Sequence, residues 1–338
     1  MSTQTGHRPL PPVVVAQTRA GEPMAVIDVT DPRFAVPDDP DSLRRLLDAS
    51  SEEERRRRRV PQFIMRWMLK RATKRSRLLR DMFGGTSAFL DGITTYVMKL
   101  GPDNLPASYD NPTERRIAAM PNLTLLRLRT QQVARLIADA LAPVLAAAPT
   151  APLHLINIAG GPAVDSMNTL IVLERRDANL LRRPIVIHVL DSDGAGPFFG
   201  RNALAALMAE GAPLAGLDVT FDHRHYDWNE PASLAALLRE LAAAGAIVAA
   251  STEGGLFEYG SDDAIVGNLQ TLRAGGVNVV AGSVTADYEA RRQMITASRF
   301  KLMPRGLKGF APLAERGGYR IAKVETARIS EQVLLAPL

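Results

Sequence analysis

Two apolar segments of the chain end on residues that are typical of a nucleoside pocket. Residues 153 to 158 form one apolar run that leads through Ala159 into Gly160 and Gly161, and a second run at residues 185 to 190 ends on Asp191. Short apolar runs bounded by turn residues predict buried strands, and neighbouring parallel strands end at the same edge of a sheet. Glycine lets the backbone approach a ligand closely, and a carboxylate can accept hydrogen bonds from both ribose hydroxyls. The two segments therefore predict opposite walls of one pocket.

From residue 153 onward, strand-like runs alternate with helical patterns. The expected strands cover residues 153 to 158, 185 to 190, 217 to 221, 246 to 250, 277 to 281, 317 to 321 and 329 to 335. The helices expected between them cover residues 164 to 176, 198 to 210, 231 to 244, 261 to 273 and 287 to 300. This alternation predicts an α/β fold with a doubly wound, mostly parallel seven-stranded sheet.

The glycine turn also narrows the choice of ligand. It continues from Gly161 into Pro162 and Ala163, so it lacks the G-x-G-x-x-G pattern of dinucleotide-binding proteins. No G-x-x-x-x-G-K-[ST] segment for a triphosphate occurs either. A dehydrogenase and a nucleotide triphosphatase are therefore disfavoured.

The order of these elements, over roughly the last 185 residues, resembles the class I S-adenosylmethionine-dependent methyltransferases, whose fold is Rossmann-like. The family's first motif aligns with residues 157 to 161, its ribose-binding acid with Asp191, and its adenine-binding position with Asp227 and Trp228. The resemblance implies S-adenosylmethionine as cofactor and S-adenosylhomocysteine as product. The cofactor-binding residues that it implies are Asn157, Ala159, Gly160, Gly161, Asp191, Ser192, Asp227, Trp228, Ser251 and Thr252.

Residues 252 to 259 are similar to the segment after the fourth strand in the small-molecule O-methyltransferase branch. This similarity implies a small organic acceptor methylated at oxygen. Ligands of open parallel sheets bind beyond the carboxyl ends of the strands, so we expect Glu253 as a catalytic base or a residue that orients the substrate, and Tyr259 as a catalytic hydroxyl donor. Glu253 could equally be a structural carboxylate that accepts loop amides. The acceptor contacts expected from the helical region and from the loop before the last strands are Tyr96, Tyr109, Arg127 and Arg305, although Arg305 could instead cap a loop carbonyl.

The chain departs from the family at one position, because the family usually has an acid where this chain has Asn157. An amide supplies no charge to attract the amino group or the sulfonium of the cofactor. This departure keeps open a degenerate, non-catalytic protein that binds a nucleoside.

Composition excludes several other classes of protein. The chain has no cysteine, so disulfides and thiolate chemistry are excluded, and five histidines without a third ligand at a familiar spacing predict no metal site. No apolar stretch is long enough to span a membrane, and no secretory signal is recognisable, so we expect a cytoplasmic protein. We expect a small-molecule acceptor as partner rather than nucleic acid, and a homodimer remains open.

The chain divides into an extended arm at residues 1 to 40, a helical lid region at 41 to 150 and the cofactor-binding domain at 151 to 338. The net charge of +5 is unevenly spread, because residues 51 to 80 contain twelve Arg or Lys and three Glu. A basic solvated helix face is the commonest reason for such a segment. An RNA or protein methyltransferase that docks through residues 55 to 80 is the alternative.

Overall fold

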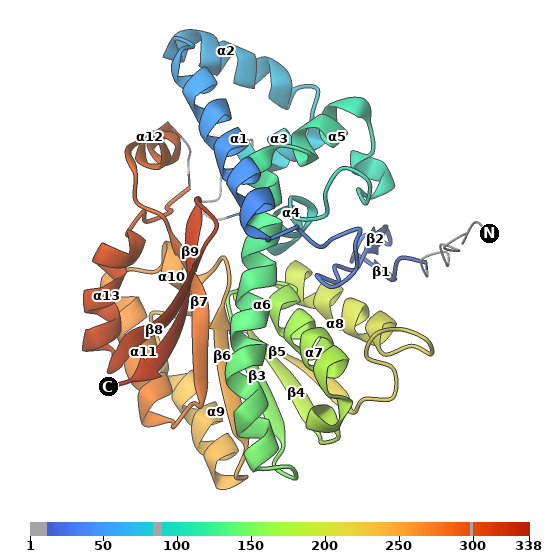
Figure 1. The fold of residues 1–338 in the computed structure, drawn as a ribbon, viewed down its shortest axis with the longest axis vertical. Helices are drawn as coiled ribbons and strands as arrows, with labels where there is room; N and C mark the ends of the chain where they lie inside the picture. Colours follow the sequence, from blue (N-terminus) through green and yellow to red (C-terminus); the bar gives the residue numbers. More distant parts are fainter. Residues whose placement is uncertain (1–11, 84–89, 298–299) are drawn as a thin grey trace, which may run out of the picture.

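The computed structural model describes residues 12–83, 90–297 and 300–338. Its centre is a seven-stranded sheet in the order β5-β4-β3-β6-β7-β9-β8 (Figure 1). The strands are β3 (Leu153–Ile158), β4 (Ile185–Leu190), β5 (Val219–Arg224), β6 (Ile247–Thr252), β7 (Val279–Thr285), β8 (Tyr319–Thr326) and β9 (Ser330–Pro337). The first five run parallel, whereas β9 lies antiparallel between β7 and β8. This arrangement confirms the mostly parallel seven-stranded sheet that the sequence predicts.

The inner part of the sheet is buried on both faces, which explains why β3, β4, β6 and β7 are mostly apolar. Alternate residues of β3 point to opposite sides: Leu153 and Leu155 belong to one apolar core, and Ile156 and Ile158 to the other. The first face is covered by α6 (Pro121–Ala147), α7 (Val164–Arg176) and α8 (Ala195–Leu207). The second is covered by α9 (Ala232–Ala243), α11 (Asp262–Ala274) and α13 (Gly306–Arg316).

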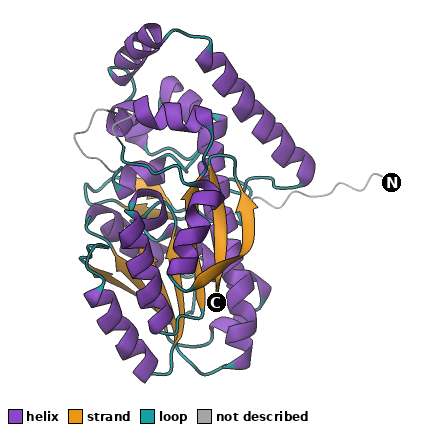
Figure 2. Ribbon diagram, turned by 90° about the vertical axis from the view of Figure 1, so that its left-hand side faces the viewer, coloured by secondary structure: helices purple, strands orange, loops and turns teal. Residues whose placement is uncertain are grey.

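The helices that precede α6 gather beyond the carboxyl ends of the parallel strands (Figures 1 and 2). They are α1 (Pro40–Arg58), α2 (Gln62–Thr73), α3 (Arg77–Phe83), α4 (Gly92–Val97), the short η1 (Ala107–Tyr109) and α5 (Pro112–Ala118). The remaining helices of the described residues are η2 (Ala178–Leu181), α10 (Leu256–Tyr259) and α12 (Glu289–Ala297).

The segment before α1 is more firmly packed than its proline-rich sequence suggested. It contains a small hairpin of β1 (Val15–Gln17) and β2 (Pro23–Ala25), after which Ile27, Val29 and Phe34 enter the first apolar core. The backbone N–H of Ile27 donates to the Tyr96 hydroxyl at 2.8 Å, and that of Val29 donates to Asn168 Oδ1 at 2.8 Å. Side chains far away in the sequence thus accept hydrogen bonds from the N–H groups of this extended segment. No local sequence pattern predicts such contacts. Residues 1 to 11 of the expected arm lie outside the described residues.

Helix and strand positions follow the sequence pattern closely. The structure has β3, β4 and α7 at the expected residues, whereas β5 through β9 begin about two residues later than expected or extend further. Within the described residues, no helix combines the length and the apolar character needed to cross a bilayer.

Candidate active site

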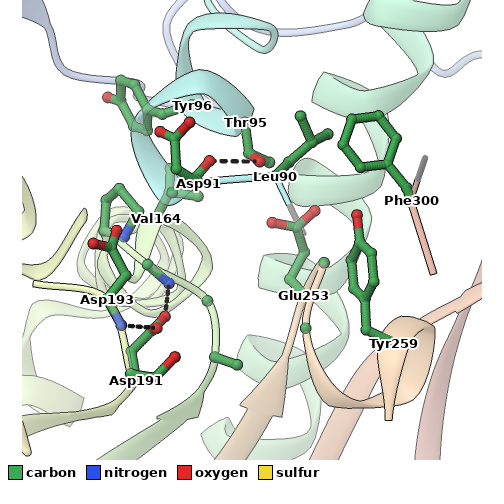
Figure 3. Close-up of a pocket in the computed structure, with 18 of the residues that line it drawn as sticks. Leu90, Asp91, Thr95, Tyr96, Val164, Asp191, Asp193, Glu253, Tyr259 and Phe300 are labelled. Atoms are coloured by element: carbon green, nitrogen blue, oxygen red, sulfur yellow. Dashed lines mark hydrogen bonds between the residues drawn. The ribbon is translucent and has the colours of Figure 1, made fainter. Parts of the chain in front are cut away.

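A cavity of about 940 Å³ lies at the carboxyl ends of β3, β4 and β6, under α3 and α4 (Figure 3). The turn after β3 contributes Gly160 and Gly161 to its wall, and the end of β4 contributes Asp191 on the other side, as the sequence predicts. The other residues of the wall that were expected to bind a ligand are Tyr96, Ala159, Ser192, Asp227, Trp228, Glu253 and Tyr259. Its volume lies in the range typical of pockets for small molecules and cofactors.

The Asp191 carboxylate is oriented by two backbone groups. Its Oδ2 accepts from the N–H of Gly161 and its Oδ1 from the N–H of Asp193, each at 2.9 Å (Figure 3). Burial raises the pKa of Asp191, although these two hydrogen bonds oppose the rise. Because an ionised carboxylate has about four acceptor positions, roughly two remain for a ligand in the cavity.

The glycine turn is held by an unusually close contact with two other glycines. Gly161 has a φ of +56°, and a Cβ added at Gly196 would lie 2.9 Å from its Cα. A Cβ added at Gly92, the first residue of α4, would lie 3.2 Å from that same Cα. The beginnings of α4 and α8 therefore meet the turn backbone to backbone, which fixes the floor of the cavity.

We expect Gly196→Ala to destabilise the protein by about 1–3 kcal/mol, because the added methyl group must displace the turn backbone. Gly194→Ala is the matched control, since a Cβ at Gly194 would have no heavy atom within 4 Å. Urea unfolding of both variants measures the difference. Equal midpoints for the two variants would contradict the packing described here.

Asn157 lies beneath the turn, outside the described wall of the cavity, and contacts a buried acid. Its Nδ2 donates to Asp165 Oδ1 at 2.6 Å and to Ser251 Oγ at 3.2 Å. Burial first, and the neighbouring Glu253 second, raise the pKa of Asp165 to about 6. A second carboxylate at position 157 would repel that of Asp165, whereas the amide of Asn157 donates a hydrogen bond to it. A buried carboxylate therefore lies directly beside Asn157, on the first turn of α7.

Glu253 belongs to a buried cluster of charges. Its Oε1 accepts from Arg129 Nε at 2.5 Å, and its Oε2 pairs with Lys99 Nζ. Arg129 reaches Glu258 Oε1 at 2.9 Å through Nη1. Although burial opposes it, the two cations lower the pKa of Glu253, so the carboxylate stays ionised and both of its oxygens are occupied. This geometry favours a structural role for Glu253 over a role as general base, because a general base needs an oxygen that can take up a proton.

Two tyrosines contribute to the wall of the cavity. The hydroxyl of Tyr96 donates to the carbonyl oxygen of Ala25 at 3.0 Å and accepts from Ile27 N–H, so it is used within the protein. Tyr259 shares the part of the cavity near Glu253, Leu90 and Phe300 (Figure 3). Burial raises the pKa of Tyr259, which keeps its hydroxyl protonated and able to donate a hydrogen bond.

Five other residues expected at the site lie outside the described wall of the cavity. Ser251 and Thr252 are buried just before Glu253. Tyr109 donates to Asp81 Oδ2 at 2.6 Å, so it touches the wall through that partner. The guanidinium of Arg127 packs on Gly101. Arg305 donates to the carbonyl oxygen of Gly260 at 2.6 Å and pairs with Asp262 at 2.8 Å. It thus caps a loop carbonyl, which was the alternative to a contact with the acceptor.

Several residues of the site escaped the sequence argument. Asp91 caps α4 and accepts from Thr94 N–H at 2.8 Å, and Asp193 accepts from the N–H groups of Ala195 and Gly196 at the start of α8. Helix-capping acids are common, so nothing in the sequence marked these two as members of a pocket wall. His225 also lines the cavity, although no sequence pattern predicted a place for it there.

The described wall is strongly acidic. Lys99 is its one lysine or arginine, and this lysine is paired with Glu253. The remaining carboxylates of the wall are Asp81, Asp91, Asp191, Asp193 and Asp227. A low-dielectric cleft lined by one sign of charge concentrates ligands of the opposite sign. In the part of the chain that the structure describes, no group of His, Asp or Glu side chains could hold a metal ion.

The chain matches no model of a known protein family and no curated protein. Among solved structures, it is similar to one described as a possible exported protein from Bordetella parapertussis, at 15% identity and a TM-score of 0.54, over 89% of this chain and 100% of that protein. At this identity the likeness establishes a shared fold and no activity.

Two further solved structures are less similar. One is a DUF574 family protein from Streptomyces avermitilis, at 13% identity and a TM-score of 0.47, over 72% of this chain and 95% of that one. The other is the O-methyltransferase NcsB1 from neocarzinostatin biosynthesis, in complex with S-adenosylmethionine and a naphthoic acid, at 14% identity and a TM-score of 0.35. In that match 68% of this chain and 62% of NcsB1 are covered.

Proposed function

From the class I methyltransferase fold, we propose that the protein transfers a methyl group from S-adenosylmethionine to an oxygen of a small organic acceptor. The observation that carries this proposal is the Asp191 carboxylate at the carboxyl end of β4, hydrogen-bonded to the glycine turn that follows β3. Ligands of open α/β sheets bind beyond the carboxyl ends of the strands, where these two features meet.

The residues of the cavity fit the proposed cofactor. Asp191 would accept from the ribose hydroxyls, and Asp227 and Trp228, which line the same cavity, would flank the adenine. The acidic wall suits a ligand that carries a sulfonium and an ammonium group. When bound, S-adenosylmethionine would supply an electrophilic methyl group, and S-adenosylhomocysteine would be the leaving group as an acceptor oxygen bonds to the methyl carbon.

The protein's own contribution is to hold the acceptor and to accept its proton. Tyr259 can donate a hydrogen bond that orients the acceptor, while Glu253 anchors the loop through Arg129 and Lys99. His225, in the same wall, is the base that we propose where the acceptor hydroxyl must lose a proton. The occupied oxygens of Glu253 also favour a second candidate, a non-catalytic protein that binds the same nucleoside.

Calorimetric titration with S-adenosylmethionine and S-adenosylhomocysteine tests the proposal. We expect micromolar binding that Asp191→Asn weakens about 100-fold, because the lost hydrogen bonds to a charged acceptor are worth about 1.5–3 kcal/mol each. Asp263→Asn is the control, since the Asp263 side chain is 94% exposed on α11. Absence of binding to either compound would refute the cofactor assignment. Binding of both without turnover, across a panel of phenols and carboxylic acids, would favour the non-catalytic candidate.

A further inference from the structure

Helix α2 exposes large apolar side chains that nothing in the described protein covers. Phe63 is 73% exposed, Trp67 61%, Met68 49% and Ile64 37%. Because a helix turns once every 3.6 residues, Phe63 and Trp67 are neighbours on successive turns, and so are Ile64 and Met68. The four side chains therefore form one apolar face, which we call the α2 face.

Cationic side chains follow the α2 face, in the last turn of the helix and just after it. Lys70, Arg71, Lys74 and Arg75 are exposed on the next turns, and Arg71 lies over the Trp67 ring at 5.7 Å. Residues 55 to 80 contain twelve Arg or Lys and no acid. The α2 face thus ends in a dense patch of positive charge, without carboxylates of its own to neutralise it.

This combination selects one kind of partner. We propose that the α2 face docks on the surface of an anionic lipid bilayer. An interfacial helix buries aromatic and aliphatic side chains at the boundary between headgroups and acyl chains, while flanking Lys and Arg pair with anionic headgroups. A second copy of this chain would bring two cationic surfaces together, which is unfavourable. Nucleic acid would satisfy the charges but would leave the aliphatic Ile64 and Met68 in water.

The position of α2 supports this orientation. It lies at the far end of α1 from the sheet, where it projects from the body of the protein (Figure 1). The chain continues from α2 into α3, whose Asp81 and Met82 form part of the cavity wall. A bilayer that holds α2 would therefore lie next to the element that leads to the cavity.

Sedimentation of the full chain with lipid vesicles tests this proposal. We expect about tenfold more protein on vesicles that mix phosphatidylglycerol with phosphatidylcholine than on phosphatidylcholine alone, with the excess lost at high salt. The double variant Phe63→Ser/Trp67→Ser and the charge reversal Lys74→Glu/Arg75→Glu should each remove most of the binding. Phe198→Ser is the control, because Phe198 is an exposed aromatic on α8 (43% exposed) and its loss should leave binding unchanged.

A second readout separates insertion from simple charge attraction. Anionic vesicles should shift the tryptophan emission of the full chain to shorter wavelength, and Trp67→Phe should abolish the shift although Trp228 remains. Each of three results would overturn the proposal: no preference for anionic vesicles, binding that survives Phe63→Ser/Trp67→Ser, or a concentration-dependent dimer that the same variant dissociates while vesicles stay unbound. Binding of a single-stranded oligonucleotide in place of vesicles would equally overturn it.

Discussion

Arg129→Met should cost the protein about 3–5 kcal/mol of its free energy of unfolding, the cost typical of breaking a buried ion pair from one side. The Arg129 side chain is 3% exposed and bonds both Glu253 and Glu258, so its loss leaves Glu253 with the Lys99 ion pair alone and removes the Arg129 ion pair of Glu258. The measurement is the urea midpoint at constant slope, which reports stability rather than a change in the unfolded state.

Arg135→Met is the matched control on the same helix. Arg135 pairs with Asp38 at the surface, where the two side chains are 38% and 35% exposed, so its loss should cost less than about 1 kcal/mol. The double variant Arg129→Met/Glu258→Gln should recover part of the stability, because it removes one of the stranded charges. Equal small losses for Arg129→Met and Arg135→Met would show that the buried cluster contributes little.

Asp165→Asn should have the opposite effect and stabilise the ligand-free protein as pH rises. The folded-state pKa of Asp165, raised to about 6, means that the folded protein binds this proton more tightly than the unfolded chain does. The contribution of Asp165 is therefore fully present below about pH 4 and is lost as pH rises through about 6. The asparagine variant has no carboxyl group at position 165 to titrate between about pH 4 and pH 6. Its free energy of unfolding should therefore exceed that of the native protein by up to about 3 kcal/mol near pH 8.

Thermal unfolding at about pH 5 and pH 8 measures this gain. The asparagine side chain would keep an acceptor oxygen for Asn157 and Ser166, so the comparison isolates the charge. A stability difference that is independent of pH would refute the assignment. If this carboxylate helps to attract a cationic ligand, Asp165→Asn should also weaken S-adenosylmethionine binding. The exchange Asn157→Asp/Asp165→Asn should restore that binding, because it returns the acid to the usual position.

The sequence was sufficient to predict the sheet, because its signals are local. Because β3 and β4 are short apolar runs and α7 has a helical periodicity of its own, these three elements were predicted at their observed residues. The contact between Gly161 and Asp191 was also predictable, since parallel strands align their carboxyl ends.

The rest of the site depends on contacts between segments far apart in the chain. Lys99 and Arg129 come from separate N-terminal segments, and nothing local indicates that Glu253, more than 120 residues later, neutralises both. The contacts of Gly92 with Gly161 and Gly196 likewise join three separate segments. Asp165 was visible as an acid on the first turn of a helix, where the helix dipole is reason enough for it. Its burial and its hydrogen bond with Asn157, which only the structure shows, distinguish it from an ordinary acid at the start of a helix.

The central position of β9 has a consequence for how the chain is made on the ribosome. β9 pairs with both β7 and β8, so neither of them has its antiparallel partner until residues 330–337 have emerged. Until then β7, all of whose seven residues are buried in the finished protein, presents an open and apolar edge. Such edges recruit strands from other chains. We therefore expect nascent chains that stall between β8 and β9 to depend on chaperones far more than full-length chains do.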